Sequence, residues 1–443
     1  MDRAVVQVRA ATIVALATIA AYAGAAGTTW QYDDFRVVVI DHDVHSWSAW
    51  WASMPGMRPL TKASYVANWL FSPLPAGFAI AGVAMHVASS LLVLALARRW
   101  LAAFAPALRR TEFAAVAAAL VFALHPAQTE AVVYIAGRST VLSSLATFTG
   151  LYAWERSREG AAGTWRAAAL LAFAASLGAR EVAWQLPFAI VLVEVARGAR
   201  LGEALRRTLP FWAAAAVLVA LVFAVPAYRR LLETSLSIRS PLDNLVAQVD
   251  AVVYLVTHPL ATLRLDFDPD LVPRAAIDAA WLAKALALVA SVAWGFAQIR
   301  LRPWLAFGIL WFALALAPTH GPLARYELAS DRQLYLAIVG PALIAGVLLA
   351  SWTVRAAANA ALALLAIVLG AATLVRVTDY ASEVRLWDAT VRANPGNARA
   401  WNNLGYAWQL AGDRERARAA YARALAIDPA HPKARVNLER LPP

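Results

Sequence analysis

Apolar stretches of about 20 residues recur along most of this 443-residue chain, and they constrain its fold more than any other feature. A helix of that length can cross a hydrocarbon core of roughly 30 Å. We therefore predict an all-α polytopic membrane bundle of about eleven spans. The spans are expected near residues 9–28, 77–98, 112–125, 129–154, 165–180, 182–197, 209–227, 279–299, 303–318, 334–352 and 355–378.

Two of these spans need comment. We expect the first to remain in the protein rather than to be a cleaved signal peptide, because no small-residue cleavage site precedes a soluble domain. The third is short and ends at His125-Pro126, so we expect it to be tilted or to stop below the surface.

Charged residues divide the chain into two parts. They make up about 13% of residues 1–378 but about 26% of residues 379–443. The second value is usual for a soluble fold, for which roughly 25% is typical. We thus expect a membrane domain over 1–378, with a first outer loop at 28–76, and a small soluble helical domain over 379–443. The absence of cysteine excludes disulfides and thiolate metal sites.

Arginines set the expected orientation, because positively charged loops stay in the cytoplasm. They gather at the N-terminus and in alternate loops, near residues 98–110, 156–166, 197–207 and 300–302. The N-terminus is then cytoplasmic, and the first long loop and the tail lie outside. The chain contains many arginines and few lysines, and this preference suggests a GC-rich bacterial genome. We therefore expect a bacterial inner-membrane protein whose site and tail are periplasmic.

Segment 243–265 leaves the number of spans open. It is moderately apolar, but it contains Asp243, Asp250, His258, Pro259 and Arg264. We interpret it as a helix that lies on or dips into the outer face. If it crosses the membrane instead, the count becomes twelve and the tail is cytoplasmic.

The net charge of +12 comes largely from arginines in the loops that we expect to be cytoplasmic. These loops face the anionic lipids of the inner leaflet. No Walker loop and no dinucleotide fingerprint is present in the sequence. We expect membrane lipids and no nucleic acid among the partners.

Residues 398–431 match the 34-residue tetratricopeptide repeat pattern. The matching positions are Trp401, Leu404, Gly405, Ala417, Tyr421, Ala424 and Pro429. Half-repeats flank this repeat, as Trp387, Pro395 and Leu438 indicate. A single repeat cannot bury its own face, so we expect support from the membrane domain or from a partner. The tail then either binds a protein or peptide or caps the membrane domain.

Two carboxylates, Asp33 and Asp34, follow the first span directly. A carboxylate at a membrane boundary can act as a general base toward a hydroxyl acceptor or as a metal ligand. Because neighbouring side chains point in different directions, we expect only one of the two to face a reaction centre. The alternative is a helix cap together with a solvated charge.

A second polar group lies between spans three and four, with His125, Glu130 and Arg138. We expect Arg138 to lie two turns along the fourth helix, on the same face as Glu130 and Tyr134. An arginine at that depth is costly unless it binds a phosphate or pairs with a carboxylate. A buried structural ion pair is the alternative, and a lone histidine is more often structural than a ligand.

Further outer-face charges complete a candidate pocket. They are Arg58, Arg180, Glu181, Asp331 and Arg332. Taken singly, each suits a solvated or snorkelling charge. Together with the two aspartates they suit an anionic lipid-linked substrate whose phosphate leaves.

At these residues the chain resembles the membrane-embedded glycosyltransferases of the C type (GT-C). Within that class it is most similar to the transmembrane and tetratricopeptide repeat-containing proteins linked to O-mannosylation. The resemblance rests on motifs in the family's order, followed by the repeat tail. These are Tyr32-Asp33-Asp34, Arg58-Pro59-Leu60, His125-Pro126, Glu130-Ala131-Val132 through Gly137-Arg138, Arg180-Glu181, Leu265-Asp266-Phe267-Asp268-Pro269 and Asp331-Arg332-Gln333-Leu334-Tyr335-Leu336.

The resemblance implies an inverting hexosyltransferase that moves a sugar, expected to be mannose, from a polyprenyl-phosphate donor to a protein hydroxyl. It implies that Asp33 is the base, that Asp34 orients the acceptor or the base, and that Arg138, Arg180 and Arg332 hold the donor phosphate. A divalent metal stays open, because Gln128 stands where relatives often carry a second histidine. No other cofactor is implied. Two alternatives remain: an O-antigen-ligase-like transferase and a non-catalytic membrane scaffold.

Overall fold

The structure is a computed structural model, and it describes residues 3–257, 265–274 and 276–442. Every regular element in these ranges is a helix, which confirms the predicted all-α class. The long helices of the bundle are α1 (Arg3–Ala21), α4 (Pro75–Phe104), α5 (Thr111–Leu124), α7 (Arg138–Arg156), α8 (Ala162–Ala179), α9 (Leu186–Ala196), α11 (Leu209–Ala224), α14 (Ala279–Gln298), α15 (Pro303–Leu316), α17 (Val339–Ala350) and α18 (Arg355–Asp379).

Shorter helices connect them. In the first half of the chain they are η1 (Ala23–Gly27), η2 (Phe35–Val39), η3 (His42–Val44), α2 (Trp47–Ala52), α3 (Pro59–Phe71), η4 (Pro126–Gln128), α6 (Thr129–Val132), η5 (Ile135–Gly137), η6 (Ala183–Gln185) and α10 (Leu201–Arg207). The later ones are α12 (Pro226–Ile238), α13 (Pro241–Thr257), η8 (Asp331–Gln333) and α16 (Leu334–Ala337). The tail consists of α19 (Glu383–Ala393), α20 (Ala398–Leu410), α21 (Arg414–Ile427) and α22 (Pro432–Arg440).

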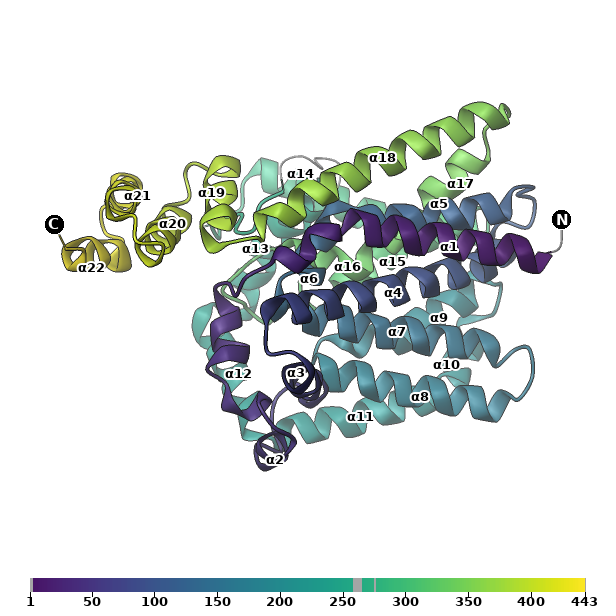
Figure 1. Cartoon of the computed structure of the whole chain (residues 1–443). Helices are drawn as coiled ribbons and strands as arrows, with labels where there is room; N and C mark the ends of the chain where they lie inside the picture. Colours follow the sequence, from purple (N-terminus) through teal and green to yellow (C-terminus); the bar gives the residue numbers. More distant parts are fainter. Residues whose placement is uncertain (1–2, 258–264, 275, 443) are drawn as a thin grey trace.

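The bundle has two distinct ends (Figure 1). The chain begins at one end, and α2, α3 and the tail α19–α22 lie at the other, which we call the tail end. The first long loop and the repeat therefore share one end of the molecule, as expected if both lie on the same side of a membrane.

Each predicted span coincides with a helix or with a pair of helices. Among the described residues, four helices are long and apolar enough to cross a membrane, or six if each of two bent pairs counts as one span. This is fewer than the eleven predicted, and three of the other helices, α9, α11 and α15, have only 11, 16 and 14 residues. At 1.5 Å per residue such helices are shorter than a bilayer core.

The third span ends where the sequence predicts. Helix α5 stops at Leu124, and the chain turns at His125-Pro126 into a second helical piece at an angle of 51°. A proline lacks the amide proton that would continue the helix, so it ends here.

The fourth span was wrongly predicted as one continuous helix over 129–154. The chain leaves α6 at Val132, forms the short turn η5 and starts again as α7 at Arg138. The turn is tightly packed, since a Cβ at Gly137 would overlap the carbonyl oxygen of Glu130.

Small residues let the central helices approach closely. Helix α5 packs between α4 and α17, and its alanines, from Ala114 to Ala119, are almost all buried. Gly346 of α17 faces this row, and a Cβ there would overlap the carbonyl oxygen of Ala114. The contact between α5 and α17 therefore depends on the missing side chain.

We expect Gly346→Ala to lower the thermal stability of the detergent-solubilised protein, since overpacking a core typically costs about 1–3 kcal/mol. Gly370→Ala in α18 is the matched control, because nothing lies within 4 Å of a Cβ there. The control should be neutral or slightly stabilising, as alanine favours helix over glycine. Equal melting temperatures for the two variants would contradict the packing argument.

Segment 243–265 forms helix α13 up to Thr257, whereas His258, Pro259 and Arg264 lie outside the described residues. Asn244 of α13 donates to the carbonyl of Gly321 at 2.8 Å. The Nδ1 atom of His320 lies 2.5 Å from the Oε1 atom of Gln248, also on α13. The helix is thus fixed to the loop that precedes η8.

The tail folds as the repeat pattern predicts. Helices α20 and α21 pack against each other, and Gly405 allows the ring of Tyr421 to come close. The tail is also docked on the bundle: Asn397 and Asn394 donate to the carbonyls of Asp268 and Pro269 at 2.9 and 3.1 Å. The membrane domain thus supplies the support that a single repeat lacks.

Candidate functional site

The two aspartates of the first loop have different environments. The carboxylate of Asp34 is fully buried and accepts hydrogen bonds from the backbone amides of Ala136 and Gln31, at 2.7 and 3.1 Å. Burial raises the pKa of Asp34 well above its ordinary value, although these two hydrogen bonds oppose the shift. Asp34 therefore ties the first loop to the turn before α7.

Asp33 is only partly buried. Its backbone amide donates to the hydroxyl of Tyr134 at 3.1 Å. Burial raises the pKa of the Asp33 carboxyl, while the charges of Arg36 and Arg332 lower it. The structure thus separates the pair: one carboxylate holds the loop, and the other lies at the surface beside an arginine.

Arg332 connects three segments of the tail end. Its backbone amide donates to Glu130 at 3.2 Å, and its Nε atom lies 3.6 Å from the same carboxylate. Its Nη2 atom donates to Glu327 at 2.7 Å. Glu130 is buried and Glu327 is partly exposed, so Arg332 bridges the interior and the surface.

Arg58 and Glu181 form a second ion pair. The Arg58 guanidinium donates from Nε and Nη2 to both carboxylate oxygens of Glu181, at 2.7 and 2.5 Å. Burial alone would raise the pKa of Glu181, but the charge and hydrogen bonds of Arg58 outweigh it and hold the pKa at about 2. Glu181 is therefore ionised, and it neutralises Arg58.

Arg180 is a buried cation of this region. It donates to the hydroxyl of Thr140, and its Nε atom has no hydrogen-bond partner among the described residues. Burial lowers the pKa of Arg180 well below its ordinary value, and the charges of Arg325, Arg58 and Arg332 lower it further. Four arginines thus lie close enough to repel one another. We call Arg58, Arg180, Arg325 and Arg332 the arginine cluster.

Arg325 was not predicted as a site residue. Among the described residues its side chain forms no hydrogen bond or ion pair, and burial together with Arg332 and Arg58 lowers its pKa, which Glu181 opposes. The signal in the sequence is the Arg325-Tyr326-Glu327 triplet, which places two charges just before Asp331 in a mostly apolar region.

Arg138 lies elsewhere than expected. Because α7 begins at this residue, its side chain does not share a helix face with Glu130. The guanidinium donates to Asn68 Oδ1 and the Phe78 carbonyl at 2.8 and 2.9 Å, and to the Ser64 carbonyl at 3.2 Å. Arg138 therefore joins α3 and α4 to α7.

His125 and Asp331 are both buried. His125 caps the turn after α5, where its Nδ1 atom accepts from the amide of Ala127 at 3.2 Å. Asp331 begins η8, inside the capping box of Ser330 and Gln333. Within the described ranges, no group of three or more histidine, aspartate or glutamate side chains could hold a metal ion.

The tail forms part of this region as well. Glu383 of α19 accepts from the backbone amide of Tyr32 at 2.7 Å, and Gln31 donates to the carbonyl of Tyr380. The ring of Tyr32 meets the edge of Trp387 with centroids 5.4 Å apart. The loop that holds Asp33 is therefore fixed from the tail side.

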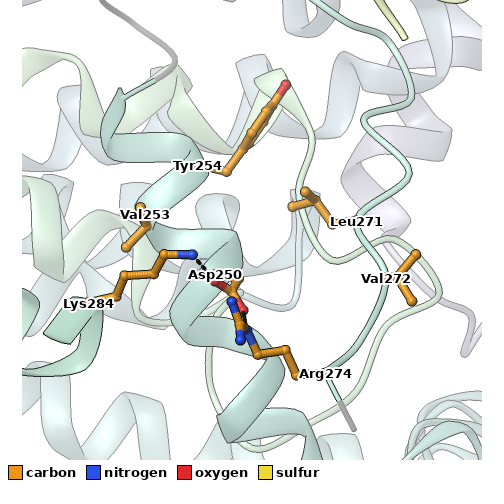
Figure 2. Close-up of a pocket in the computed structure, with 7 residues that line it drawn as sticks. All are labelled: Asp250, Val253, Tyr254, Leu271, Val272, Arg274 and Lys284. Carbon is orange, nitrogen blue, oxygen red and sulfur yellow. Dashed lines mark hydrogen bonds and ion pairs between the residues drawn. The ribbon is translucent and has the colours of Figure 1, made fainter. Parts of the chain in front are cut away.

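Two hollows lie near this end. The larger, of about 400 Å³, lies beside α13 and α14 (Figure 2). Its only carboxylate in the figure, Asp250, is paired with Arg274 and Lys284 at 2.5 and 2.6 Å. The smaller, of about 210 Å³, lies between the body and the tail and is lined by Asp268, Glu327 and Arg399, among others. In the larger hollow the charge of Asp250 is thus neutralised by Arg274 and Lys284. Neither Asp33 nor a residue of the arginine cluster lines it.

Comparison with known proteins agrees with this picture. The Tetratricopeptide repeat family matches residues 398–431. The chain is also similar to Protein O-mannosyl-transferase Tmtc2 of Drosophila melanogaster, with 29% identity over 200 residues, which is 40% of this chain and 20% of the relative. The match thus spans about a fifth of the length of that protein.

Apolar helices and a C-terminal tetratricopeptide repeat together define a helical membrane protein with a repeat tail. More particularly, the chain is similar to the transmembrane and tetratricopeptide repeat-containing O-mannosyltransferases.

Proposed function

We propose that this protein transfers a sugar from a polyprenyl-phosphate donor to a hydroxyl group of a protein acceptor. The observation that carries the proposal is the position of Asp33, a partly exposed residue whose backbone amide donates to Tyr134. Tyr134 lies near Glu130, the partner of Arg332, so that the charge of Arg332 acts on the Asp33 carboxyl. A base and a group of cations are the two elements that such a transfer needs, and they meet here.

The chemistry follows from these charges. The acceptor hydroxyl loses its proton as it attacks the anomeric carbon, and Asp33 takes that proton. The bond from the anomeric carbon to the donor phosphate breaks, and the phosphate leaves with an additional negative charge. Attack from the side opposite the leaving group inverts the anomeric configuration.

The arginine cluster is suited to stabilise the departing phosphate. Arg58 is already neutralised by Glu181, and Arg332 is shared with two glutamates. Arg180 and Arg325 lack a carboxylate partner among the described residues, so they carry the excess positive charge. We assign the donor phosphate to these two side chains together with Arg332.

The name of the similar fly protein supports mannose as the sugar. The charged loops support a location in a bacterial inner membrane, with Asp33 and the tail on the periplasmic side. That placement would let the lipid chain of the donor stay in the bilayer while its phosphate reaches the arginine cluster.

Sugar transfer by the purified full-length protein tests the proposal. The protein would receive polyprenyl-phosphate mannose, or other lipid-linked sugars in parallel, together with serine- and threonine-containing acceptor peptides. We expect mannose to appear on the acceptor with inverted anomeric configuration. Absence of transfer and of donor turnover with every lipid-linked sugar would contradict the proposal and favour a scaffold.

A further inference from the structure

A groove separates the membrane domain from the tail. Its walls are the segment 268–273, residues 326–329 and Arg399 of α20, and its volume is about 210 Å³. Ligand sites are often found at such boundaries between domains. This groove is distinct from the larger hollow beside α13, although both are lined by Leu271 and Val272.

The charges that line the groove are mainly acidic. Asp268 pairs with Arg399, whose Nε atom donates to it at 2.7 Å, and Glu327 pairs with Arg332. Asp270 also lines the groove, and it is exposed. Its side chain forms no hydrogen bond or ion pair with any of the described residues. One lining carboxylate therefore stays available to a ligand, and its charge favours a cation.

The wall beside Asp270 is a segment without regular secondary structure, in which Asp270 itself has a positive φ of 48°. Residues 268–273 form no helix or strand, and the backbone amides and carbonyls of Leu271 and Val272 bond to none of the described residues. Unpaired backbone groups of this kind can form hydrogen bonds with the main chain of a bound peptide. The groove thus offers both main-chain and charge recognition.

The groove also leads to Asp33. The ring of Tyr32, the residue before Asp33, packs against the ring of Phe267, with ring centroids 6.5 Å apart, and Phe267 directly precedes the lining residue Asp268. Glu327, which lines the groove, also acts on the pKa of Asp33. The groove therefore lies next to the loop that carries the candidate base.

We propose that this groove binds the acceptor as an extended polypeptide with a lysine or arginine near the hydroxyl that is modified. The inference rests on the proposed function and adds the class of acceptor to it. The two charged regions then have separate roles: the arginine cluster attracts the donor phosphate, whereas the acidic groove repels phosphate and attracts a basic peptide.

Photocrosslinking tests the groove without any turnover. The full-length protein would carry a benzophenone amino acid in place of Tyr326, which lines the groove and is 77% exposed. Two peptides serve as probes: in one the serine is flanked by lysines, and in the other it is flanked by glutamates. We expect the basic peptide to crosslink up to about fivefold more than the acidic one, a ratio appropriate to one exposed charge pair.

Charge reversal supplies the matched comparison. Asp270→Lys should abolish the preference for the basic peptide and raise its KM in the transfer assay, while the KM of the donor stays unchanged. Glu203→Gln, which removes an exposed carboxylate of α10, should change neither. Equal crosslinking of both peptides, or an unchanged preference in Asp270→Lys, would overturn the inference even if transfer occurs. Selective crosslinking without any transfer would keep the groove and reject the proposed function.

Discussion

Replacing Asp33 by asparagine is expected to lower the rate of sugar transfer by about 10²–10⁴-fold, the usual contribution of a general base. The amide keeps the size of the side chain but cannot take the proton of the acceptor hydroxyl. The fold should persist, because the loop is held by Asp34 and by Glu383 rather than by the Asp33 carboxylate. Transfer kinetics and the melting temperature of the variant would be measured together.

The control lies in the same loop. Asp43 is an exposed carboxylate paired with Lys62, and Asp43→Asn should leave the rate nearly unchanged. Similar rates for Asp33→Asn and the wild type would mean that the base lies elsewhere.

The pH dependence of sugar transfer provides an independent test of Asp33 as the base. The base works only when ionised, and burial raises the pKa of Asp33 above its ordinary value of 3.8. Activity should therefore fall as the pH drops through a value above 3.8, and that acidic limb should be missing from the residual activity of Asp33→Asn.

Arg332→Met is expected to produce the largest loss of stability. It leaves the buried Glu130 without its cation, and breaking a buried ion pair by removing one partner typically costs about 3–5 kcal/mol. Arg99→Met is the control, because its partner Glu159 is exposed and such surface pairs contribute about 0–1 kcal/mol. Denaturant unfolding of the solubilised protein would measure both.

A double variant separates stability from chemistry. Adding Glu130→Gln to Arg332→Met removes the unpaired charge and should recover a large part of the lost stability. It should not recover transfer, since the cation beside Asp33 is still missing. If the double variant transfers sugar at the wild-type rate, Arg332 serves the fold alone.

Hydropathy was sufficient to predict the positions of most long helices, because an apolar segment of about 20 residues in this chain is usually helical. His125-Pro126 marked a helix end correctly, because a proline lacks the amide proton that would continue the helix. The repeat was recognisable because small residues at fixed spacing, such as Gly405, are needed for two helices to approach.

The break before Arg138 was not predictable from local sequence. Residues 133–137 are apolar and compatible with a helix, and the break is stabilised by a distant group, since Asp34 binds the amide of Ala136. An error in this one turn changed the expected direction of Arg138. The sequence placed the other charges at one end, but which of them pair depends on the tertiary structure, as Arg58 with Glu181 shows.

The attachment of the first loop to the tail has a consequence for biosynthesis. Gln31 and Tyr32 are fastened by Tyr380 and Glu383, partners that lie 349 and 351 positions later in the chain. A ribosome has synthesised almost the whole bundle before those partners exist. The loop that carries Asp33 can therefore reach its final position only near the end of translation, so an incomplete chain in the membrane has its helices but not yet the arrangement of its site.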